Sequence, residues 1–168
     1  MSLLTGAQIL GLIGSLKPPL IENYRSIRFQ LQPAGFDLSL AKIMEPAKMP
    51  DEPVEFSRAK DFAEMMVEHD FKKPVQPFKP YRLVTNETIN FPLNMTGMCI
   101  TRSSLTRLGA VLGSGIIDAG FRGVLNFSLI TPIAIKFKEN DRFVQMMVEE
   151  HEPTFAYTGQ FQQVLNTI

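Results

Sequence analysis

Hydrophobic and polar residues alternate over most of the second half of the chain, which is typical of half-buried β-strands. The stretch 124–137, VLNFSLITPIAIKF, has one hydrophobic face made of Leu125, Phe127, Leu129, Ile133, Ile135 and Phe137. Residues 83–104 predict two or three short strands with a bend at Phe91 and Pro92, and 143–153 predict a last strand after a turn at 139–142. Many short strands at regular spacing favour a β sandwich or barrel.

Helical spacing occurs at two places. After Thr5, a plausible N-cap, the chain has an apolar face made of Ile9, Leu10, Ile13 and Leu16, and Pro18 and Pro19 end this short helix. A further helix is expected over 57–69, with Phe62, Met65, Met66 and His69 on one face. Between the two helices, residues 27–31 and 36–40 alternate on either side of a turn at 33–35, which predicts two strands.

Length and composition narrow the class of protein. The 168 residues fit one domain spanning 1–168. Lys and Arg together number 17, as do Asp and Glu, and this zero net charge argues against a general nucleic-acid binder. Cys99 has no second cysteine for a disulfide, and the two histidines have no partner cysteines for a zinc site. The apolar start lacks the charged region of a signal peptide and is too short to span a bilayer, so we expect a cytoplasmic protein with no membrane partner.

Four polar clusters interrupt the predicted strands at turns: AGFDLSL around Asp37, RSSLTR over 102–107, GSGIIDAGFRG around Asp118, and DRFVQM with Arg142 and Gln145. Each has a plain structural interpretation. Asp37 would shape an Asx turn, RSSLTR would be a capped helical turn with its arginines in solvent, Asp118 would sit in a hairpin turn, and Gln145 would be a buried amide.

Taken together, the clusters indicate a small phosphorylated ligand beside an activated water. An arginine followed by two serines offers N–H and hydroxyl donors that suit phosphate oxygens. Glycines at 113, 115 and 120 allow a ligand to approach the backbone closely. A carboxylate that follows Ile116 and Ile117 could hold and deprotonate a water.

In these four clusters and their order, the chain resembles the superfamily of trimeric dUTP pyrophosphatases (dUTPases) and dCTP deaminases. The resemblance spans about 27–146. The stretches LLTGAQILGLI and RSSLTRLG resemble the deaminase branch more than the shorter dUTPases. It implies an all-β, distorted jelly roll with a short N-terminal helix. It also implies homotrimers with active sites built between subunits, in which the C-terminal tail, about 152–168, acts as an arm over the active site.

The resemblance further implies a dUTP diphosphatase. Asp118 would deprotonate a water that attacks the α-phosphorus of dUTP, releasing dUMP and pyrophosphate. Mg²⁺ would be held mainly by the substrate phosphates, with Asp37 supporting its water shell. Phe121 would pack on the deoxyribose, and the segment 113–117 would form a hairpin that reads uracil. The implied substrate-binding residues are Arg102, Ser103, Ser104, Arg107, Gly113, Ser114, Gly115, Ile117, Phe121, Arg142, Gln145, Tyr157 and Gln160.

Deamination of dCTP, alone or together with diphosphatase activity, is the alternative, and a non-catalytic nucleotide-binding regulator on the same fold is another. The deaminase branch carries a catalytic glutamate ten residues after the third-motif aspartate, where this chain has Ser128. Because serine cannot act as that base unaided, the sequence favours the diphosphatase. The tail also departs from the dUTPases, since no arginine follows Arg142. It resembles the Y-x-G-Q tail of the deaminase branch at Tyr157, Gly159 and Gln160.

Overall fold

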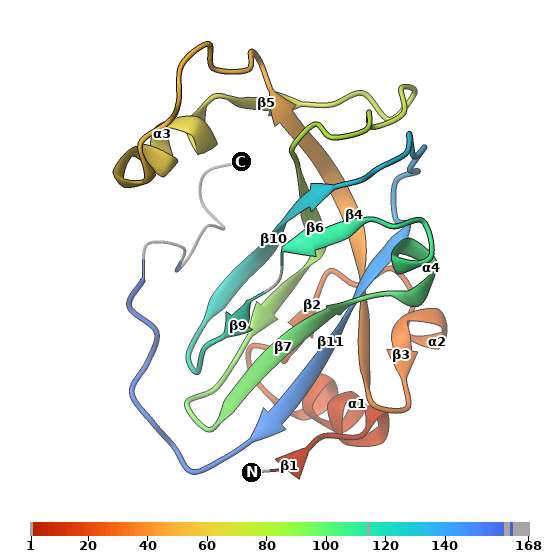
Figure 1. Ribbon diagram of the computed structural model, residues 1–168. Helices are drawn as coiled ribbons and strands as arrows, with labels where there is room; N and C mark the ends of the chain where they lie inside the picture. Colours follow the sequence, from red (N-terminus) through yellow and green to blue (C-terminus); the bar gives the residue numbers. More distant parts are fainter. Residues whose placement is uncertain (1, 114, 160–161, 163–168) are drawn as a thin grey trace.

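A long strand, β4 (Gly35–Pro46), joins two layers of antiparallel sheet in the computed structural model, which describes residues 2–113, 115–159 and 162 (Figure 1). The first half of β4 pairs with β11 (Arg142–Glu150), followed in that layer by β7 (Met95–Thr101) and β9 (Ile116–Ile117). The second half pairs with β6 (Tyr81–Asn90), followed by β10 (Arg122–Ile130) and β8 (Val111–Gly113). The chain therefore curls into a mostly β fold, as the alternation predicted, and this fold is of the jelly-roll type that the resemblance implied.

Short strands extend both layers at their edges. β1 (Ser2–Leu3) pairs with β11 and β3 (Leu31–Gln32) with the start of β4, while β2 (Ile21–Glu22) pairs with β6 and β5 (Met66–Glu68) with the end of β4. The hydrophobic core fills the space between the layers. Its centre includes an edge-to-face contact between Phe127 of β10 and Phe143 of β11, with ring centroids 5.5 Å apart. This contact joins the two layers, and it buries Phe127 from the hydrophobic face that the alternation predicted.

The N-terminal helix is confirmed as α1 (Gly6–Ser15). Thr5 caps it through a capping box, in which Thr5 and Gln8 bond each other's backbone N–H groups. Ile9 and Ile13 are buried, but the placement of Leu10 on the same face is wrong, because its side chain is 45% exposed.

The strand predicted over 27–31 is wrong, since Ile27–Gln30 forms a helical turn, α2, and Phe29 is 60% exposed. Gln30 explains the difference. Its side-chain oxygen accepts hydrogen bonds from the backbone N–H groups of Arg25 and Ser26, and its amide nitrogen donates to the carbonyl of Asp37. These bonds, together with one from the same amide nitrogen to Glu87 of β6, stabilise a turn that local alternation does not indicate.

Two further predictions are corrected in part. The helix expected over 57–69 is shorter, consisting of a 3₁₀ turn, η1 (Phe56–Arg58), and α3 (Ala59–Glu64), which projects away from the sheet in Figure 1. The residues that follow become β5 because β4 offers them a free edge. The strand expected over 124–137 stops at Ile130, because Pro132 has no N–H to donate to a sheet and Thr131 bonds its own turn.

A cluster of three polar side chains, which we call the clasp, holds the segment after β5 against β4. The Glu45 carboxylate lies 2.5 Å from Lys79 Nζ and 3.0 Å from Nδ1 of the buried His69. The His69 ring packs edge-on against Tyr81, with centroids 5.4 Å apart. Burial raises the pKa of Glu45, but the hydrogen bonds from Lys79 and His69 outweigh it and hold that pKa below its ordinary value of 4.5.

This clasp predicts acid-sensitive stability. A carboxylate whose pKa is lowered by folding stabilises the folded state above its unfolded pKa, and this contribution is lost as pH falls through the folded pKa. We expect Glu45→Gln to lower the free energy of unfolding by about 1 kcal/mol at pH 7 and by progressively less below pH 4.5. Urea unfolding at several pH values checks this. Glu68→Gln, which changes an exposed carboxylate 3.7 Å from Lys42, is the control and should show little pH dependence. A Glu45→Gln effect that stays constant down to pH 3 would contradict the prediction.

Candidate active site

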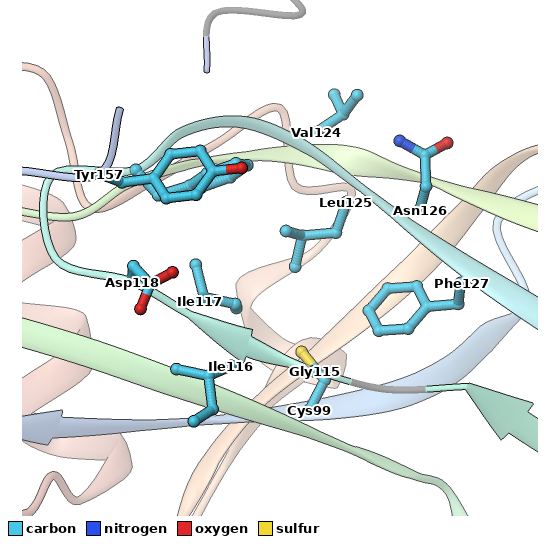
Figure 2. Close-up of a pocket in the computed structure, with 11 residues that line it drawn as sticks. Cys99, Gly115, Ile116, Ile117, Asp118, Val124, Leu125, Asn126, Phe127 and Tyr157 are labelled. Carbon is cyan, nitrogen blue, oxygen red and sulfur yellow. The ribbon is translucent and has the colours of Figure 1, made fainter. Parts of the chain in front are cut away.

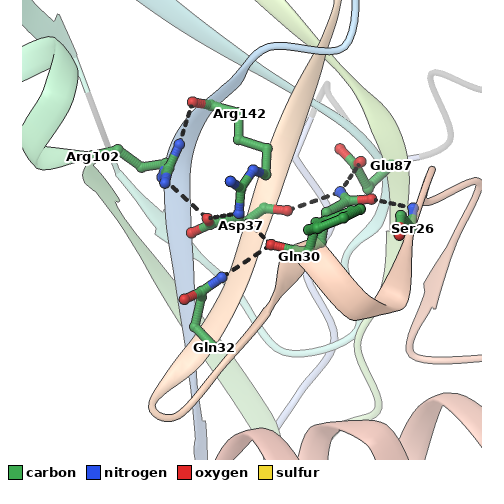
Figure 3. A network of polar contacts seen from close by, with 8 residues as sticks. Ser26, Gln30, Gln32, Asp37, Glu87, Arg102 and Arg142 are labelled. Carbon is green, nitrogen blue, oxygen red and sulfur yellow. Dashed lines mark hydrogen bonds and ion pairs between the residues drawn. The ribbon is translucent and has the colours of Figure 1, made fainter.

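Two arginines converge on one buried carboxylate (Figure 3). Asp37 of β4 is 1% exposed, and its Oδ2 lies 3.0 Å from Nε of Arg102 and 3.0 Å from Nη1 of Arg142. Arg102 also donates to the backbone carbonyl of Arg142. Burial raises the pKa of Asp37, while the charges of the two guanidinium groups oppose this shift. Two cations on one anion leave a net positive charge that suits an anionic ligand.

Strand register explains this convergence. Asp37 pairs with Gln145 across β4 and β11, and Gln145 pairs with Ile100 across β11 and β7. Arg102 directly follows the end of β7. The resulting surface is a hollow of about 280 Å³, lined by Gln32, Asp37, Ile100, Thr101, Arg102, Ser103, Gln145 and Met147. We call it the arginine pocket, and it holds members of three of the four clusters that the sequence singled out.

The RSSLTR cluster forms a helical turn, α4 (Ser103–Thr106), as its plain structural interpretation expected. Arg102, however, pairs with Asp37 and is not free in solvent. Ser104 lines a neighbouring hollow on the other side of the arginines. Lys136, which the sequence analysis did not select as a ligand residue, lines that hollow as well. Arg107 is exposed and lines neither hollow.

A second pocket surrounds the third cluster (Figure 2). It has a volume of about 210 Å³ and is lined by Cys99, Gly115, Ile116, Ile117, Asp118, Phe121, Val124, Leu125, Asn126, Phe127 and Tyr157. We call it the Asp118 pocket. Asp118 and Tyr157 lie at one end, and Phe127 and Cys99 at the other. Burial raises the pKa of Cys99 to about 12, so its thiol is neutral and contributes only apolar surface.

The predicted hairpin over 113–117 is wrong. β8 pairs with β10 and β9 pairs with β7, so this segment crosses from one sheet layer to the other. Gly113 packs closely on Ser128, whose Oγ would overlap with a Cβ at position 113. Gly115 has open space around it and lines the Asp118 pocket. Ser114, a predicted binding residue, lies outside the described residues.

The described part of the C-terminal tail lies against the body of the same chain. The backbone N–H groups of Thr154 and Tyr157 donate to the carbonyls of Leu93 and Ala119. The Tyr157 ring packs edge-on against Phe121 with centroids 5.8 Å apart, and so forms a wall of the Asp118 pocket. Gln160, the other predicted binding residue of the tail, lies outside the described residues.

The arginine pocket and the Asp118 pocket are separate within one chain. They share no lining residue among those that the structure describes. Asp118 follows Ile117, which pairs with Gly97 near the start of β7, while Arg102 follows the other end of that strand. Gly97 and Arg102 are five residues apart, and five steps of extended chain put about 17 Å between these two places. One chain by itself therefore does not bring Asp118 to the arginines.

Within 2–113, 115–159 and 162, no group of three or more histidine, cysteine, aspartate and glutamate side chains is placed to hold a metal ion. Over the same residues, no helix has the length and apolar character needed to cross a membrane.

Comparison with known proteins finds relatives of this chain in sequence and in fold. The profile of the dCTP deaminase-like family matches residues 3–151. A protein of Methanosarcina mazei named "Probable deoxyuridine 5'-triphosphate nucleotidohydrolase" is 31% identical over 175 residues, covering 96% of this chain and 97% of that one. Among solved structures, the 2'-deoxycytidine 5'-triphosphate deaminase of Agrobacterium tumefaciens has a TM-score of 0.69 at 18% identity, covering 87% of this chain and 46% of that chain. The dUTPase of phage phi11 of S. aureus, which coordinates a structural Mg(II) ion, has a TM-score of 0.50 at 16% identity, covering 84% and 93%.

Proposed function

Because the chain belongs to the dCTP deaminase-like family, we propose that it is a dUTP diphosphatase, which hydrolyses dUTP to dUMP and pyrophosphate. One observation carries this choice within the family. Asp118 lines a pocket of mostly apolar residues, and no other carboxylate lines that pocket among the described residues. The near-full-length relative from M. mazei, whose name is that of a dUTP hydrolase, supports the same activity.

In the proposed reaction, Asp118 accepts a proton from a water that attacks the α-phosphorus, and pyrophosphate leaves with the bond electrons. The Asp118 pocket binds the uracil and the deoxyribose, with Phe121 packed against the sugar so that a 2′-hydroxyl is excluded. Arg102, Ser103 and Gln145 in the arginine pocket bind the phosphates together with Arg142, which lines the neighbouring hollow, and the positive charge of the two arginines stabilises the leaving group. Ser104 and Arg107 are assigned to the same phosphates by the resemblance alone.

The proposed active site is completed by a second copy of the chain in a homotrimer. The separation of the two pockets along β7 supports this, because the arginines of one subunit need an Asp118 from another. An exposed apolar face also supports it. Met98, Ile100 and Ile116 of β7 and β9 are 48%, 49% and 71% exposed. Burial of such a face between copies is the usual reason for its presence on a folded chain.

The donor groups of the arginine pocket fit Mg²⁺ only together with the substrate. Asp37 is the acid of the arginine pocket, and its Oδ2 is already bonded to both arginines, so Asp37 does not by itself form a cation site. This fits an ion held mainly by substrate phosphates. When bound there, Mg²⁺ would neutralise charge on the phosphates. Support of its water shell by Asp37 and the cytoplasmic location of the enzyme both remain predictions.

Deamination of dCTP is the second candidate, since the family profile takes its description from that activity. Its ring chemistry requires an acid beside the base. Ser128, which occupies the position of the deaminase glutamate, does not line the Asp118 pocket and packs against Gly113. The diphosphatase is therefore the better supported activity.

One assay separates these functions. Purified protein is incubated with Mg²⁺ and either dUTP or dCTP, and both pyrophosphate and ammonia are measured. We expect pyrophosphate from dUTP and no ammonia from dCTP. Ammonia from dCTP would show that another group acts as the ring base, and tight dUTP binding without either product would indicate a regulatory nucleotide binder.

A further inference from the structure

A second buried carboxylate, Glu87 of β6, lies behind the arginine pocket and takes no part in the proposed chemistry. It is 0% exposed. Its Oε2 accepts a hydrogen bond of 2.8 Å from the Ser39 backbone N–H, and its Oε1 accepts bonds of 2.6 Å from Ser39 Oγ and 2.6 Å from Gln30 Nε2. Burial raises the pKa of Glu87, although these three donors oppose the shift. No cation pairs with it among the residues that the structure describes.

Burying a carboxyl group costs free energy, because the group loses its hydrogen bonds to water, and the hydrogen bonds to Ser39 and Gln30 have to offset this cost. A methionine or leucine at position 87 would fill the same space without this cost. The carboxylate is therefore expected to do something that an apolar side chain cannot do, and its bonding partners indicate what that is.

Gln30, the last residue of α2, connects this helical turn to Glu87 through a set of hydrogen bonds that we call the relay. Its amide nitrogen bonds both Glu87 and, at 2.9 Å, the backbone carbonyl of Asp37, while its oxygen accepts from the backbone N–H groups of Arg25 and Ser26 at 2.7 and 2.9 Å. All these bonds depend on one orientation of the amide, and the Glu87 carboxylate selects that orientation together with the Asp37 carbonyl, since both can only accept from the amide nitrogen. Figure 3 shows the row of contacts from Glu87 through Gln30 to Asp37.

The arginines rest on the segments that this relay holds. Arg142 Nη1 donates to the backbone carbonyl of Phe29 in α2 and to the Asp37 carboxylate, and Arg102 Nε donates to the same carboxylate. Ser39, which holds the other side of Glu87, stands two residues after Asp37 in β4. Both acceptors of Arg142 are thus connected to Glu87 through Gln30. Phe29 directly precedes Gln30 in the chain, and the Asp37 carbonyl accepts a hydrogen bond from the Gln30 amide.

We propose that Glu87 is a positioning residue, which holds α2 and the start of β4 so that Arg102 and Arg142 are set in place for the triphosphate. This positioning role rests on the proposed function, because the anion that the arginines bind is taken to be the triphosphate of dUTP. Glu87 itself is fully buried and does not touch the substrate.

Glu87→Gln is the direct test. The variant has nearly the same shape, but its NH₂ group must face one of the three donors, so the relay is disrupted. We expect KM for dUTP to rise about tenfold with a smaller change in kcat, and the affinity for tripolyphosphate, measured by calorimetry, to fall about tenfold. The affinity for dUMP, which lacks the outer phosphates, should change less than about twofold.

The control is Thr88→Val in the same strand. Thr88 is 2% exposed, and its hydroxyl accepts one hydrogen bond, from Asn23, away from the relay. It should lower stability and leave KM and tripolyphosphate affinity unchanged. A folded Glu87→Gln protein with wild-type KM and tripolyphosphate affinity would overturn the proposal.

Two further outcomes are distinguishable. If the wild type binds tripolyphosphate without hydrolysing dUTP, the proposed function fails, and a weaker affinity in Glu87→Gln still supports the positioning role. If Glu87→Gln does not fold, Ser39→Ala removes one of the three bonds and keeps the acid. An approximately threefold loss of tripolyphosphate affinity then supports the proposal, and an unchanged affinity overturns it.

Discussion

Asp118→Asn is expected to lower kcat for dUTP hydrolysis by about 10³-fold, since an amide cannot accept the proton of the attacking water. The side chain keeps its shape, and the apolar walls of the Asp118 pocket are unaffected. KM and the affinity for dUMP should therefore stay within about twofold of the wild type. Steady-state kinetics with pyrophosphate detection, together with dUMP titration calorimetry, measure both quantities.

Asp61→Asn is the matched control, because Asp61 is an exposed acid of α3 whose partner is Arg58. It should hydrolyse dUTP at the wild-type rate. If Asp118→Asn retained more than about a tenth of the wild-type kcat, Asp118 would not be the base, and another group would have to activate the water.

Mixing two inactive variants is expected to restore activity. In the proposed trimer, the arginines of one subunit face Asp118 of the next, so Arg102→Ala and Asp118→Asn damage opposite halves of each shared site. When the two chains are unfolded together and refolded as a random mixture, one site in four has an intact pair. We expect about a quarter of the wild-type activity from such a mixture, and nearly none from either variant refolded alone.

This experiment distinguishes a shared site from a site within one chain. Mixtures that stay as inactive as their components, although gel filtration shows mixed trimers, would mean that both halves must lie on the same subunit. Sedimentation analysis of the wild type supplies the oligomeric state independently. A monomer with full activity would contradict the shared site as well.

Predictions from sequence succeeded where a local pattern is itself the physical cause of the structure. Thr5 caps α1 because a capping box needs only residues within one turn. β10 and β11 form where apolar residues alternate, because one face of each strand is buried. Arg102, Asp37 and Gln145 belong to polar clusters that interrupt the predicted strands at turns, and the structure brings them to one pocket.

The missed features depend on contacts between distant parts of the chain. Alternation over 27–31 indicates a strand, but Gln30 meets Glu87, 57 residues away, and a helical turn forms. The segment 113–117 looks like a hairpin, yet its two strands pair with different neighbours in different layers. No local sequence pattern predicted a role for Glu87, because only its burial in the folded chain distinguishes it from other glutamates.

The β architecture, the N-terminal helix and the types of side chain available for phosphate and water follow from periodicity and chemistry within short stretches of the chain. Which of these side chains meet depends on the whole fold. The two-layer curl of the sheet brings Asp37 between Arg102 and Arg142 and leaves Asp118 near the other end of β7. The reason is that strand pairing and burial are properties of the whole folded chain, and a short stretch of sequence carries no record of its partners.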